Sequence, residues 1–411
     1  MPSFQFIPET RSVGRARWLL SLLCAGSVAG CAQGAGTLPA GGPSSAHAAS
    51  GLNHARYAVA PAIYAFEGSP DGSTPYAGLI DVGGTLYGMT AGGGTALQGI
   101  VFSVTPGGTE TVLHSFTGIP DGAQPLGGLI DVAGTLYGMT NVGGARGNGT
   151  IFSITRSGKE KVLYSFGTAV NDGINPQGDL LYSGGAFYGT TGGGGSTGCG
   201  TVFKFAPTGK KTGKETVIYN FAGGSDGCGP QSALIEFNGA LYGTTYTGGS
   251  SNSDGTVFKV TLAGKETVLH AFTGQPDGSD AHAALIAYGD NLYGMTEEGG
   301  SKGLGMVFKM TPKGKLTIIH NFTNTKGEGY HPLGSTLLNV NGKFYGTVPA
   351  TYTGSGAIFE ITPSGSESLV YVFNYNVAPP YSNVIDAGGL LYGTTVNGGP
   401  ADQGTVYAVP L

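Results

Sequence analysis

The chain has 411 residues, of which 78 are glycine, 40% are hydrophobic and 11% are charged, and its formal net charge is -5. So much glycine without a Gly-X-Y period excludes collagen, and the hydrophobic and aromatic content argues against disorder. Lys and Arg form no cluster, so we expect no nucleic-acid partner. The composition therefore favours a turn-rich all-β protein.

Residues 1–31 have the pattern of an export signal. Arginines precede an apolar run from Trp18 to Val28, which is too short to span a bilayer. The run ends in Val-Ala-Gly-Cys at Cys31, which resembles the lipobox of bacterial lipoproteins, where the signal is cut before the cysteine and the cysteine carries the lipid. Ala32 follows, where an aspartate would indicate retention at the inner membrane. We therefore expect an outer-membrane lipoprotein on the bacterial cell envelope, whose membrane partner is reached through the lipid on Cys31.

An ordinary secretory signal cut at Ala46-His47-Ala48 is the alternative, although this site lies far beyond the apolar run. In the lipoprotein interpretation, residues 32–60 form a tether, because they are rich in Ala, Gly, Ser and Pro and show no periodicity. A flexible chain of about thirty residues reaches roughly 30 Å. The domain that follows would then lie clear of the membrane surface.

A repeat of about 50 residues organises the rest of the chain. The segment Leu241-Tyr242-Gly243-Thr244-Thr245 returns in similar form around tyrosines 87, 137, 188, 242, 293, 345 and 392. The fourth copy predicts four short strands, at Ser232–Phe237, Ala240–Thr245, Thr256–Thr261 and Glu266–Phe272. Four antiparallel strands at this period are typical of a propeller blade.

The two ends of the repeat array predict a closed ring. The chain enters the array with one fourth strand, Pro61–Phe66, and leaves it with three strands, Tyr381–Asp386, Leu390–Thr395 and Gly404–Val409. An open array would leave strand edges unpaired. We therefore predict an all-β fold, a seven-bladed β-propeller of four-stranded blades over residues 61–411, with the N-terminal strand completing the last blade. We expect it to be a monomer.

The repeat resembles the GloVer tandem repeat of bacterial surface proteins. The shared pattern reads Asp121-Gly122-Ala123-Gln124-Pro125, Leu241-Tyr242-Gly243-Thr244-Thr245, Gly255-Thr256-Val257-Phe258-Lys259 and Glu266-Thr267-Val268-Leu269-His270-Ala271-Phe272. This resemblance covers residues 61 to 411. It implies display on the envelope and supplies no catalytic residues.

Function is best sought in residues that occur in one blade only, because residues present in every blade build the blades. The long loops emerge on one face of the predicted disc, which we call the long-loop face, and loops on a rigid scaffold often bind ligands. The departures from the repeat gather there in the fifth and sixth blades. The candidate ligand-binding residues are Asp277, Asp280, His282, Glu297, Glu298 and His331.

Three functions are compatible with this set. A binding or scaffold module for a glycan, a protein or a small ligand fits best, because no hydrolase or phosphate-loop motif occurs. Asp280 with His282 could instead serve as an acid/base pair of an enzyme acting on envelope polysaccharide. A purely structural surface protein would leave these charges solvated. We expect more readily a protein without catalysis than an enzyme, and we assign no catalytic residue.

The recurring Asp-Gly pairs, at 71, 121, 172, 226 and 277, are expected to form turns in which Asp caps the turn and Gly takes a positive φ. Calcium binding by these loop carboxylates is the alternative. His114, His270 and His320 fall on outer strands of different blades and so cannot share one metal. We therefore predict no metal site and no resident cofactor.

Four cysteines are present. Cys24 would leave with the signal and Cys31 would take the lipid, which leaves Cys199 and Cys228. Both fall in long loops of one blade, at adjacent ends of an antiparallel strand pair. Because an exported compartment permits the bond, we predict a disulfide between them.

Overall fold

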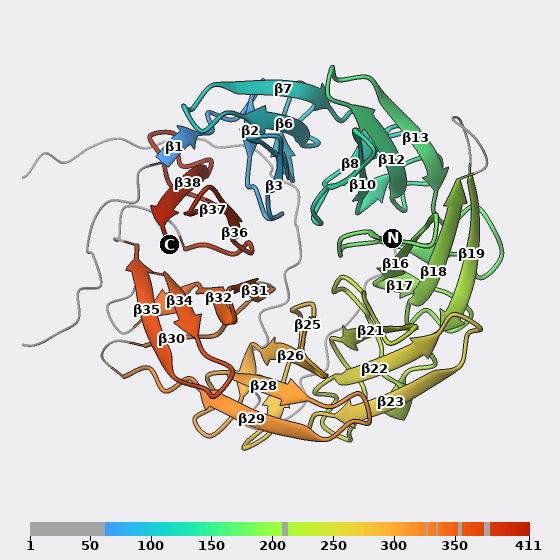
Figure 1. The fold of residues 1–411 in the computed structure, drawn as a ribbon. Coiled ribbons are helices and arrows are strands. Elements are labelled where there is room, and N and C mark those ends of the chain that lie inside the picture. Colours follow the sequence, from blue (N-terminus) through green and yellow to red (C-terminus); the bar gives the residue numbers. More distant parts are fainter. Residues whose placement is uncertain (1–61, 208–212, 326–327, 334–335, 352–355, 374–378) are drawn as a thin grey trace, which may run out of the picture. The chain divides into compact units, whose positions relative to one another are not determined.

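The computed structural model describes residues 62–207, 213–325, 328–333, 336–351, 356–373 and 379–411. The predicted signal, Cys31 and the tether lie outside the described residues. Within the unit that spans Asn53–Leu411, seven four-stranded antiparallel sheets are arranged in a ring (Figure 1), which confirms the predicted seven-bladed propeller.

Each blade is numbered here in chain order, and its strands run from the innermost to the outermost. The first three blades consist of β3 (Ile80–Val82), β4 (Thr85–Thr90), β6 (Ile100–Val104) and β7 (Glu110–Ser115); β9 (Ile130–Val132), β10 (Thr135–Thr140), β12 (Thr150–Thr155) and β13 (Glu160–Ser165); and β15 (Leu181–Ser183), β16 (Ala186–Thr191), β18 (Thr201–Pro207) and β19 (Gly213–Asn220).

The next three blades consist of β20 (Ile235–Phe237), β21 (Ala240–Thr245), β22 (Thr256–Thr261) and β23 (Glu266–Ala271); β25 (Ile286–Tyr288), β26 (Asn291–Thr296), β28 (Met306–Met310) and β29 (Leu316–Asn321); and β31 (Leu338–Val340), β32 (Lys343–Val348), β34 (Ala357–Ile361) and β35 (Glu367–Val372). The seventh blade contains both ends of the ring: β36 (Ile385–Ala387), β37 (Leu390–Thr395), β38 (Thr405–Pro410) and, outermost, β1 (Ala62–Ala65).

The ring closes as the sequence predicts, through the pairing of β1 with β38. Ala65 lies opposite Thr405 in this ladder, and the Phe66 amide donates to the Gly404 carbonyl over 3.0 Å. In Figure 1 the first strand lies beside the last one, so that strands from the two ends of the ring share one sheet. Closure therefore pairs the edge of β38 that the C-terminal strands alone would leave open.

The segment Leu-Tyr-Gly-Thr-Thr recurs because its residues pack against, or form hydrogen bonds with, neighbouring strands and blades. In the fourth blade Leu241 is fully buried, and a Cβ on Gly243 would lie 2.7 Å from Cζ of Phe258 on the neighbouring strand. Thr244 donates through its hydroxyl to the Ala283 carbonyl of the next blade over 3.3 Å, and the Thr245 hydroxyl meets that of Thr256 at 2.9 Å. The motif thus links strands within a blade and one blade to the next.

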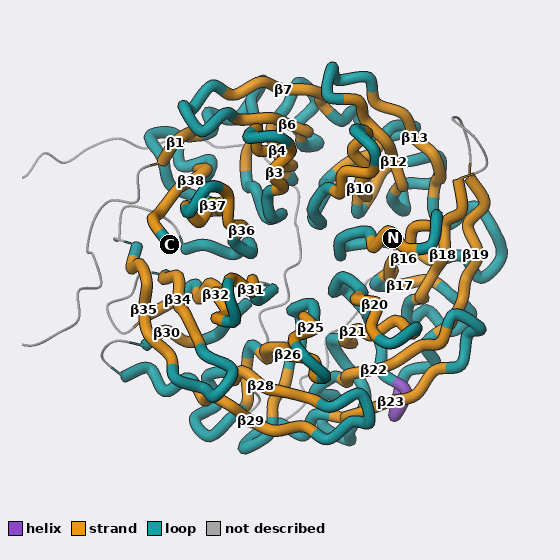
Figure 2. The backbone as a smooth tube through the Cα atoms, in the orientation of Figure 1, coloured by secondary structure: helices purple, strands orange, loops and turns teal. Residues whose placement is uncertain are grey.

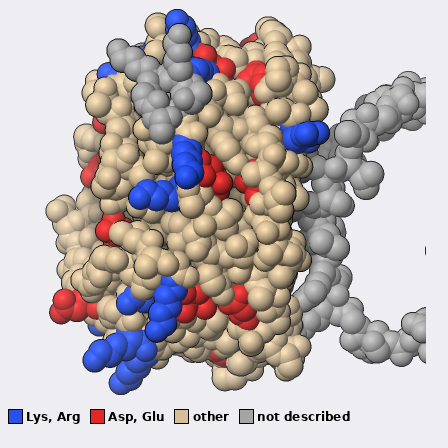
Figure 3. Space-filling view, turned by 90° about the vertical axis from the view of Figure 1, so that its right-hand side faces the viewer, with Lys and Arg blue, Asp and Glu red and all other residues tan. Residues whose placement is uncertain are grey.

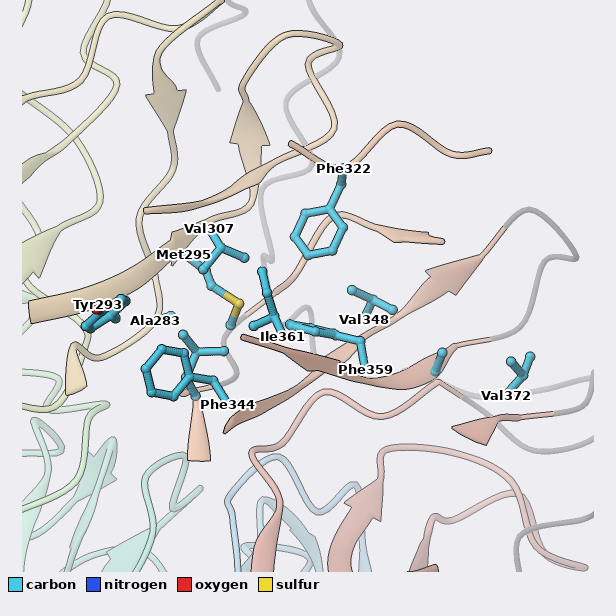
Figure 4. Close-up of a cluster of buried hydrophobic side chains, with 12 residues drawn as sticks. Ala283, Tyr293, Met295, Val307, Phe322, Phe344, Val348, Phe359, Ile361 and Val372 are labelled. Atoms are coloured by element: carbon cyan, nitrogen blue, oxygen red, sulfur yellow. The ribbon is translucent and has the colours of Figure 1, made fainter. Parts of the chain in front are cut away.

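The hydrophobic core lies between consecutive blades. Seven clusters of buried side chains fill the seven junctions, and each cluster draws residues from two neighbouring blades. Figure 4 shows the junction of the fifth and sixth blades, where Met295 and Val307 meet Phe344 and Phe359. Burying a side chain of this size contributes about 1.5–3 kcal/mol, so the junctions hold the blades together.

The innermost strands are shorter than predicted. The sequence predicts a strand over Ser232–Phe237, but β20 contains only Ile235–Phe237, and in the tube of Figure 2 the inner strands are short orange segments between loops. In the fourth blade, a residue just before the inner strand bonds to the neighbouring blade and not within the ladder: the Ser232 carbonyl accepts from the Thr190 hydroxyl over 2.9 Å.

Five two-stranded ribbons brace the loops of the long-loop face. They pair the Asp-Gly connection that enters a blade with the loop after that blade's second strand. They are β2 (Gly72–Ser73) with β5 (Gly92–Gly93), β8 (Gly122–Ala123) with β11 (Val142–Gly143), β14 (Gly173–Ile174) with β17 (Gly193–Gly194), β24 (Gly278–Ser279) with β27 (Glu298–Gly299), and β30 (Gly329–Tyr330) with β33 (Ala350–Thr351). The described residues also contain one 3-10 helix, η1 (Gly224–Asp226).

Candidate functional site

Five of the six predicted ligand-binding residues belong to the fifth blade, in the connection that enters it and in the loop after its second strand. His282 lies just before β25, and its Nε2 is 3.3 Å from Oε2 of Glu297, at the end of β26. The two side chains are 23% and 21% exposed, so the pair is accessible from solvent. The His282 ring packs on the ring of Tyr246 from the fourth blade, with centroids 4.4 Å apart. His282 is thus held between an aromatic face and a carboxylate.

Asp280 is the third member of this group. Its backbone is fixed on both sides, because its amide donates to the Asp254 carbonyl and its carbonyl accepts from the Glu297 amide, each over 3.1 Å. Burial raises the pKa of its carboxyl to about 6, and the charges of Glu298, Glu297 and Asp254 add to the rise while His282 opposes it. Asp280 is therefore a carboxyl that changes charge near neutral pH.

Glu298 and His331 complete the group from two sides. Glu298 belongs to the ribbon strand β27, opposite Ser279, and its charge acts on Asp280. His331 belongs to the entry of the sixth blade, and its Nδ1 lies 3.1 Å from the Glu297 carbonyl. We call Tyr246, Asp280, His282, Glu297, Glu298 and His331 the fifth-blade cluster.

Asp277 is a blade-building residue, although the sequence grouped it with the others. Its Oδ2 lies 2.9 Å from Nε2 of His270 on β23 and accepts from the Thr273 amide over 3.2 Å. The same arrangement recurs at the other Asp-Gly pairs. Tyr219 donates to Asp226 over 2.7 Å, and Tyr64 donates to Asp71 over 2.9 Å. The carboxylate of Asp277 therefore makes its contacts within its own turn and with His270, so we do not count Asp277 among the residues that could bind a ligand.

The predicted turn chemistry at these pairs is right for Asp, but for Gly it is right at one pair and wrong at the other four. The carboxylate of Asp71 caps its turn by accepting from the Gly72 amide over 2.6 Å. Gly227 has the predicted positive φ, at 93°, whereas Gly72, Gly122, Gly173 and Gly278 do not have a positive φ. A Cβ on Gly72 would lie 2.6 Å from Cγ2 of Thr90, so glycine is required by close approach to the Leu-Tyr-Gly-Thr-Thr strand of the blade it enters.

The backbone of the fifth-blade cluster is ordinary for this fold. Asp280 and His331 have positive φ values of 56° and 54°, but Thr74, Gln124 and Asn175 have the same conformation at the same place in other blades. The contact of His331 with the Glu297 carbonyl also has a counterpart, since Asn175 donates to the Asn141 carbonyl over 3.2 Å. What distinguishes the fifth blade is its side chains.

Sequence reasoning missed the tyrosines that accompany the cluster. Tyr246 occupies the position that Glu297 holds one blade later, and Tyr381 and Tyr76 precede the inner strands of the seventh and first blades. The rings of Tyr76 and Tyr381 contact one another with centroids 6.5 Å apart. Burial raises the pKa of Tyr381, with smaller contributions from Tyr76 and Glu297, so Glu297 acts on this pair too. Comparing equivalent repeat positions could have found these residues.

The charges of the molecule are not confined to one face. Figure 3 looks at the edge of the ring, where Lys and Arg side chains lie beside Asp and Glu side chains on a surface made mostly of other residues. The recurring aspartates accept hydrogen bonds within their turns, so their carboxylate oxygens already have partners. This weakens the alternative in which these aspartates bind calcium.

The predicted disulfide is confirmed. Cys199 and Cys228 are bonded, with Cα atoms 4.6 Å apart. The bond joins the start of the third blade's strand β18 to the connection that enters the fourth blade. Within the described residues, no helix is both long and apolar enough to cross a membrane.

Comparison with solved structures finds several distant likenesses. A luciferin-regenerating enzyme is 14% identical, with a TM-score of 0.44, over 68% of this chain and 88% of its own. PorZ, a surface component of the type-IX secretion system of Porphyromonas gingivalis, is 12% identical, with a TM-score of 0.48, over 80% of this chain and 46% of its own. The gluconolactonase XC5397 from Xanthomonas campestris is 12% identical, with a TM-score of 0.40, over 85% of this chain and 88% of its own.

A search of proteins with curated descriptions gave no significant match. The sequence profile of the Gloeobacter/Verrucomicrobia repeat, in contrast, matches residues 35–254 and again residues 184–407. Together the two matches cover most of the chain and all but the last few residues of the ring. The repeated segments are those that build the blades. The chain therefore belongs to the Gloeobacter/Verrucomicrobia repeat family, the GloVer repeat that its sequence resembles.

Proposed function

We propose that this propeller is a binding module of the bacterial cell envelope that takes a carbohydrate ligand at the fifth-blade cluster. The observation that carries the proposal is the contrast between blades. The backbone is repeated around the ring, yet within the described residues only the fifth blade has a His–Glu pair whose His packs on a tyrosine ring and which is flanked by two further carboxylates. Function on repeat scaffolds is expected where the repeat is broken.

The chemistry of the cluster suits a hydroxyl-rich ligand. Half-buried aromatic rings offer an apolar face with a polar edge, and the carboxylates of Glu297, Glu298 and Asp280 can accept hydrogen bonds from hydroxyl or ammonium groups. The neighbouring Tyr76–Tyr381 pair extends the aromatic surface toward the first and seventh blades. A few polar groups placed beside rings on a rigid frame are typical of small-molecule sites.

The test is a titration of the protein with soluble fragments of envelope glycans, followed by calorimetry and thermal shift. Substitutions His282→Ala and Glu297→Gln should each weaken binding at least tenfold without lowering the melting temperature of the free protein. Lys313→Ala is the matched control, because Lys313 is an exposed residue of the hairpin between β28 and β29 in the same blade, on the opposite face. Equal affinity of all four proteins would refute the assignment of the site.

Location is the second part of the proposal. We propose that Cys31 carries the lipid that anchors the protein to the outer membrane, with residues 32–60 as tether. Replacing Cys31 with Ser should move the protein from the membrane fraction to the soluble fraction and abolish incorporation of labelled fatty acid. Membrane association that survives the substitution would contradict the anchor.

Asp280 supports one alternative function, hydrolysis of an envelope glycan. A carboxyl whose pKa burial raises to about 6, beside a histidine, can donate a proton near neutral pH. In that case Asp280→Asn would retain glycan binding and abolish release of reducing ends. Binding without any turnover by the wild type would leave the binding module as the function.

A further inference from the structure

A second group of side chains repeats around the outer edge of the ring, one group per blade junction. At the junction of the third and fourth blades, the hydroxyl of Tyr219 donates to Asp226 over 2.7 Å. Glu266, on the next blade's outer strand, lies against this pair, and its pKa rises to about 7 through burial and the charge of Asp226. We call such a group a junction cluster: an aromatic residue or His, the acid of the following turn, and the acid on the next outer strand.

Six junction clusters lie in the described residues and differ in composition. Three contain tyrosine, and three contain histidine. The tyrosine clusters are Tyr64/Asp71/Glu110, Tyr164/Asp172/Glu215 and Tyr219/Asp226/Glu266, and the histidine clusters are His114/Asp121/Glu160, His270/Asp277/Leu316 and His320/Glu328/Glu367.

Two of the histidine clusters bring three ligand types together. In His114/Asp121/Glu160 and in His320/Glu328/Glu367, one nitrogen or oxygen from each residue lies within 4.8 Å of those of the other two. Ligands about 2.1 Å from a tetrahedral metal are roughly 3.4 Å apart, so small rotations of half-buried side chains suffice to close the set. The third histidine cluster has Leu316 in place of the second acid and cannot supply a third ligand.

These two clusters also have unused ligand atoms. Among the described residues, Oε1 of Glu160, Oε1 of Glu367 and Nε2 of His320 are buried without a hydrogen-bond partner, and so is the corresponding Oε1 of Glu110, Glu215 and Glu266 in the tyrosine clusters. The His320 ring donates to the backbone of Gly365, which fixes the ring and leaves Nε2 for another partner. Beside Asp121 and Glu160 lies an open cavity of about 420 Å³, lined also by Pro120 and Ser165, through which an ion could enter.

Electrostatics favours a cation at both places. Each cluster places two carboxyl groups beside an imidazole in a half-buried setting, and burial is expensive for carboxylates without a counter-charge. A divalent ion brings two positive charges and can compensate both carboxylates of a cluster, whereas a proton can compensate only one.

We propose that the junctions of the first and second blades and of the fifth and sixth blades each bind one divalent transition-metal ion of the zinc class, through His114, Asp121 and Glu160 and through His320, Glu328 and Glu367. One imidazole and two carboxylates form a donor set that such ions accept, with water as a fourth ligand. Because the third ligand belongs to the next blade, each ion cross-links two blades at the rim. The sequence prediction of no metal weighed one ion shared by the three histidines and calcium at the turn aspartates, and did not weigh each histidine together with the acids of its own junction.

The chain provides the test, since its sister clusters show which substitutions the fold accepts. His114→Tyr and His320→Tyr convert each cluster to the tyrosine form of three other junctions. Metal-free protein is titrated with Zn²⁺ by calorimetry, and bound zinc is counted after dialysis. We expect two equivalents for the wild type, one for each single substitution and none for the double substitution. Zn²⁺ should raise the melting temperature of the wild type most, that of each single variant less, and that of the double variant not at all.

Leu316→Glu is the complementary experiment. It adds the missing acid beside His270 and Asp277 and should raise the count from two equivalents to three. The proposal is overturned by a wild type that binds no zinc, or by a double tyrosine variant that keeps two equivalents. Zinc held by the fifth-blade cluster would be revealed by loss of binding in His282→Ala instead.

Discussion

Gly243 shows at residue scale why the repeat has so little freedom. The third-strand phenylalanine of the same blade, Phe258, lies over it, and a Cβ would be 2.7 Å from Cζ of Phe258 and 3.0 Å from Cδ2 of Leu234. Both neighbours are buried. We expect Gly243→Ala to lower the free energy of unfolding by about 1–3 kcal/mol through overpacking, measured by urea denaturation.

Gly107→Ala is the control for this substitution. Gly107 does not have a positive φ, and the nearest atom to an added Cβ is 3.8 Å away, so the midpoint of unfolding should change little. Equal effects of the two substitutions would mean that the cost at Gly243 comes from backbone conformation and not from the Phe258 ring.

The acids of the tyrosine junction clusters predict a dependence of stability on pH. The folded pKa of Glu266 is about 7 against an ordinary value of 4.5, because of burial and Asp226, so the folded state binds more protons between these values. The contribution of Glu266 to the free energy of unfolding is fully present below about pH 4.5 and is lost as the pH rises through about 7. Glu110 and Glu215 are shifted in the same direction. We expect the wild type to unfold at lower urea at pH 8 than at pH 5.

Glu266→Gln isolates one of these groups, since the amide cannot ionise. Its unfolding midpoint should vary less between pH 5 and pH 8 than that of the wild type. Glu67→Gln is the matched control, because Glu67 is exposed and should leave the wild-type slope intact. A slope that is the same in all three proteins would show that Glu266 titrates alike in both states.

The junction clusters also show what sequence reading can and cannot reach at this scale. The spacing is visible: His114 and Asp121 are seven residues apart, as are Tyr64 and Asp71, and Glu160 falls four residues before Tyr164. The seven-residue spacings suggest a hydrogen bond between the two side chains across one turn. Glu160 lies beside the His114–Asp121 pair because the ring places the second blade next to the first. The local sequence gives no signal for this contact.

At the scale of elements, the strand pairs could be predicted and the loops could not. Period, aromatic positions and the Asn238-Gly239 hairpin indicated each blade and its strand order. The ribbons that brace the long-loop face, such as β24 with β27, are only two residues long and pair segments about twenty residues apart. Glycine-rich loops carry no pattern that marks such a pairing.

The disulfide supports a junction where a single bridge replaces the two-residue ribbon. At the entry to the fourth blade, Cys228 forms an isolated bridge with Thr247, while five other entries have a two-residue ribbon. The bond closes a segment with a sequence separation of 29. Replacing both Cys199 and Cys228 with Ser should reduce the free energy of unfolding by up to about 3–4 kcal/mol, as measured in guanidinium chloride.

A reductant provides the control for this prediction. It should lower the unfolding midpoint of the wild type toward that of the double serine variant and leave the variant unchanged. If the variant and the oxidised wild type unfold together, the 3-10 helix η1 and the Cys228–Thr247 bridge are enough to hold this entry.

At the scale of the whole molecule, the count of blades and the closure of the ring followed from the sequence because they are properties of a repeat. Six complete copies, with one strand before them and three strands after them, permit few arrangements. The residues of the fifth-blade cluster were found for the opposite reason, since they depart from the repeat, and their role in binding stays a prediction. Asp277 could have been separated from them in the sequence, because it belongs to a recurring Asp-Gly pair and lies seven residues after its partner His270.

The pairing of β1 with β38, which closes the ring, leads to a prediction for the whole molecule. Strand β1 contributes the outer strand of the seventh blade, and the adjoining Phe66 is fully buried, with its ring centroid 5.0 Å from that of Phe102 in the first blade. A chain that begins at Glu67 lacks both, so β38 becomes an open edge and the junction between the seventh and first blades loses an anchor. Loss of a buried Phe alone costs about 3–5 kcal/mol. We expect this chain to unfold at lower temperature and to associate through the exposed edge.

A chain that begins at Pro61 is the matched control, because it keeps β1 and removes only residues before the ring. It should melt like the full chain and elute as a monomer, whereas the chain beginning at Glu67 should elute as larger species by size-exclusion chromatography. Adding a peptide of residues 61–66 should restore part of the lost melting temperature, since the ladder with β38 can form in trans. If the chain beginning at Glu67 is as stable and as monomeric as the control, the junction cores hold the ring without its shared blade, and closure serves only to protect the edge.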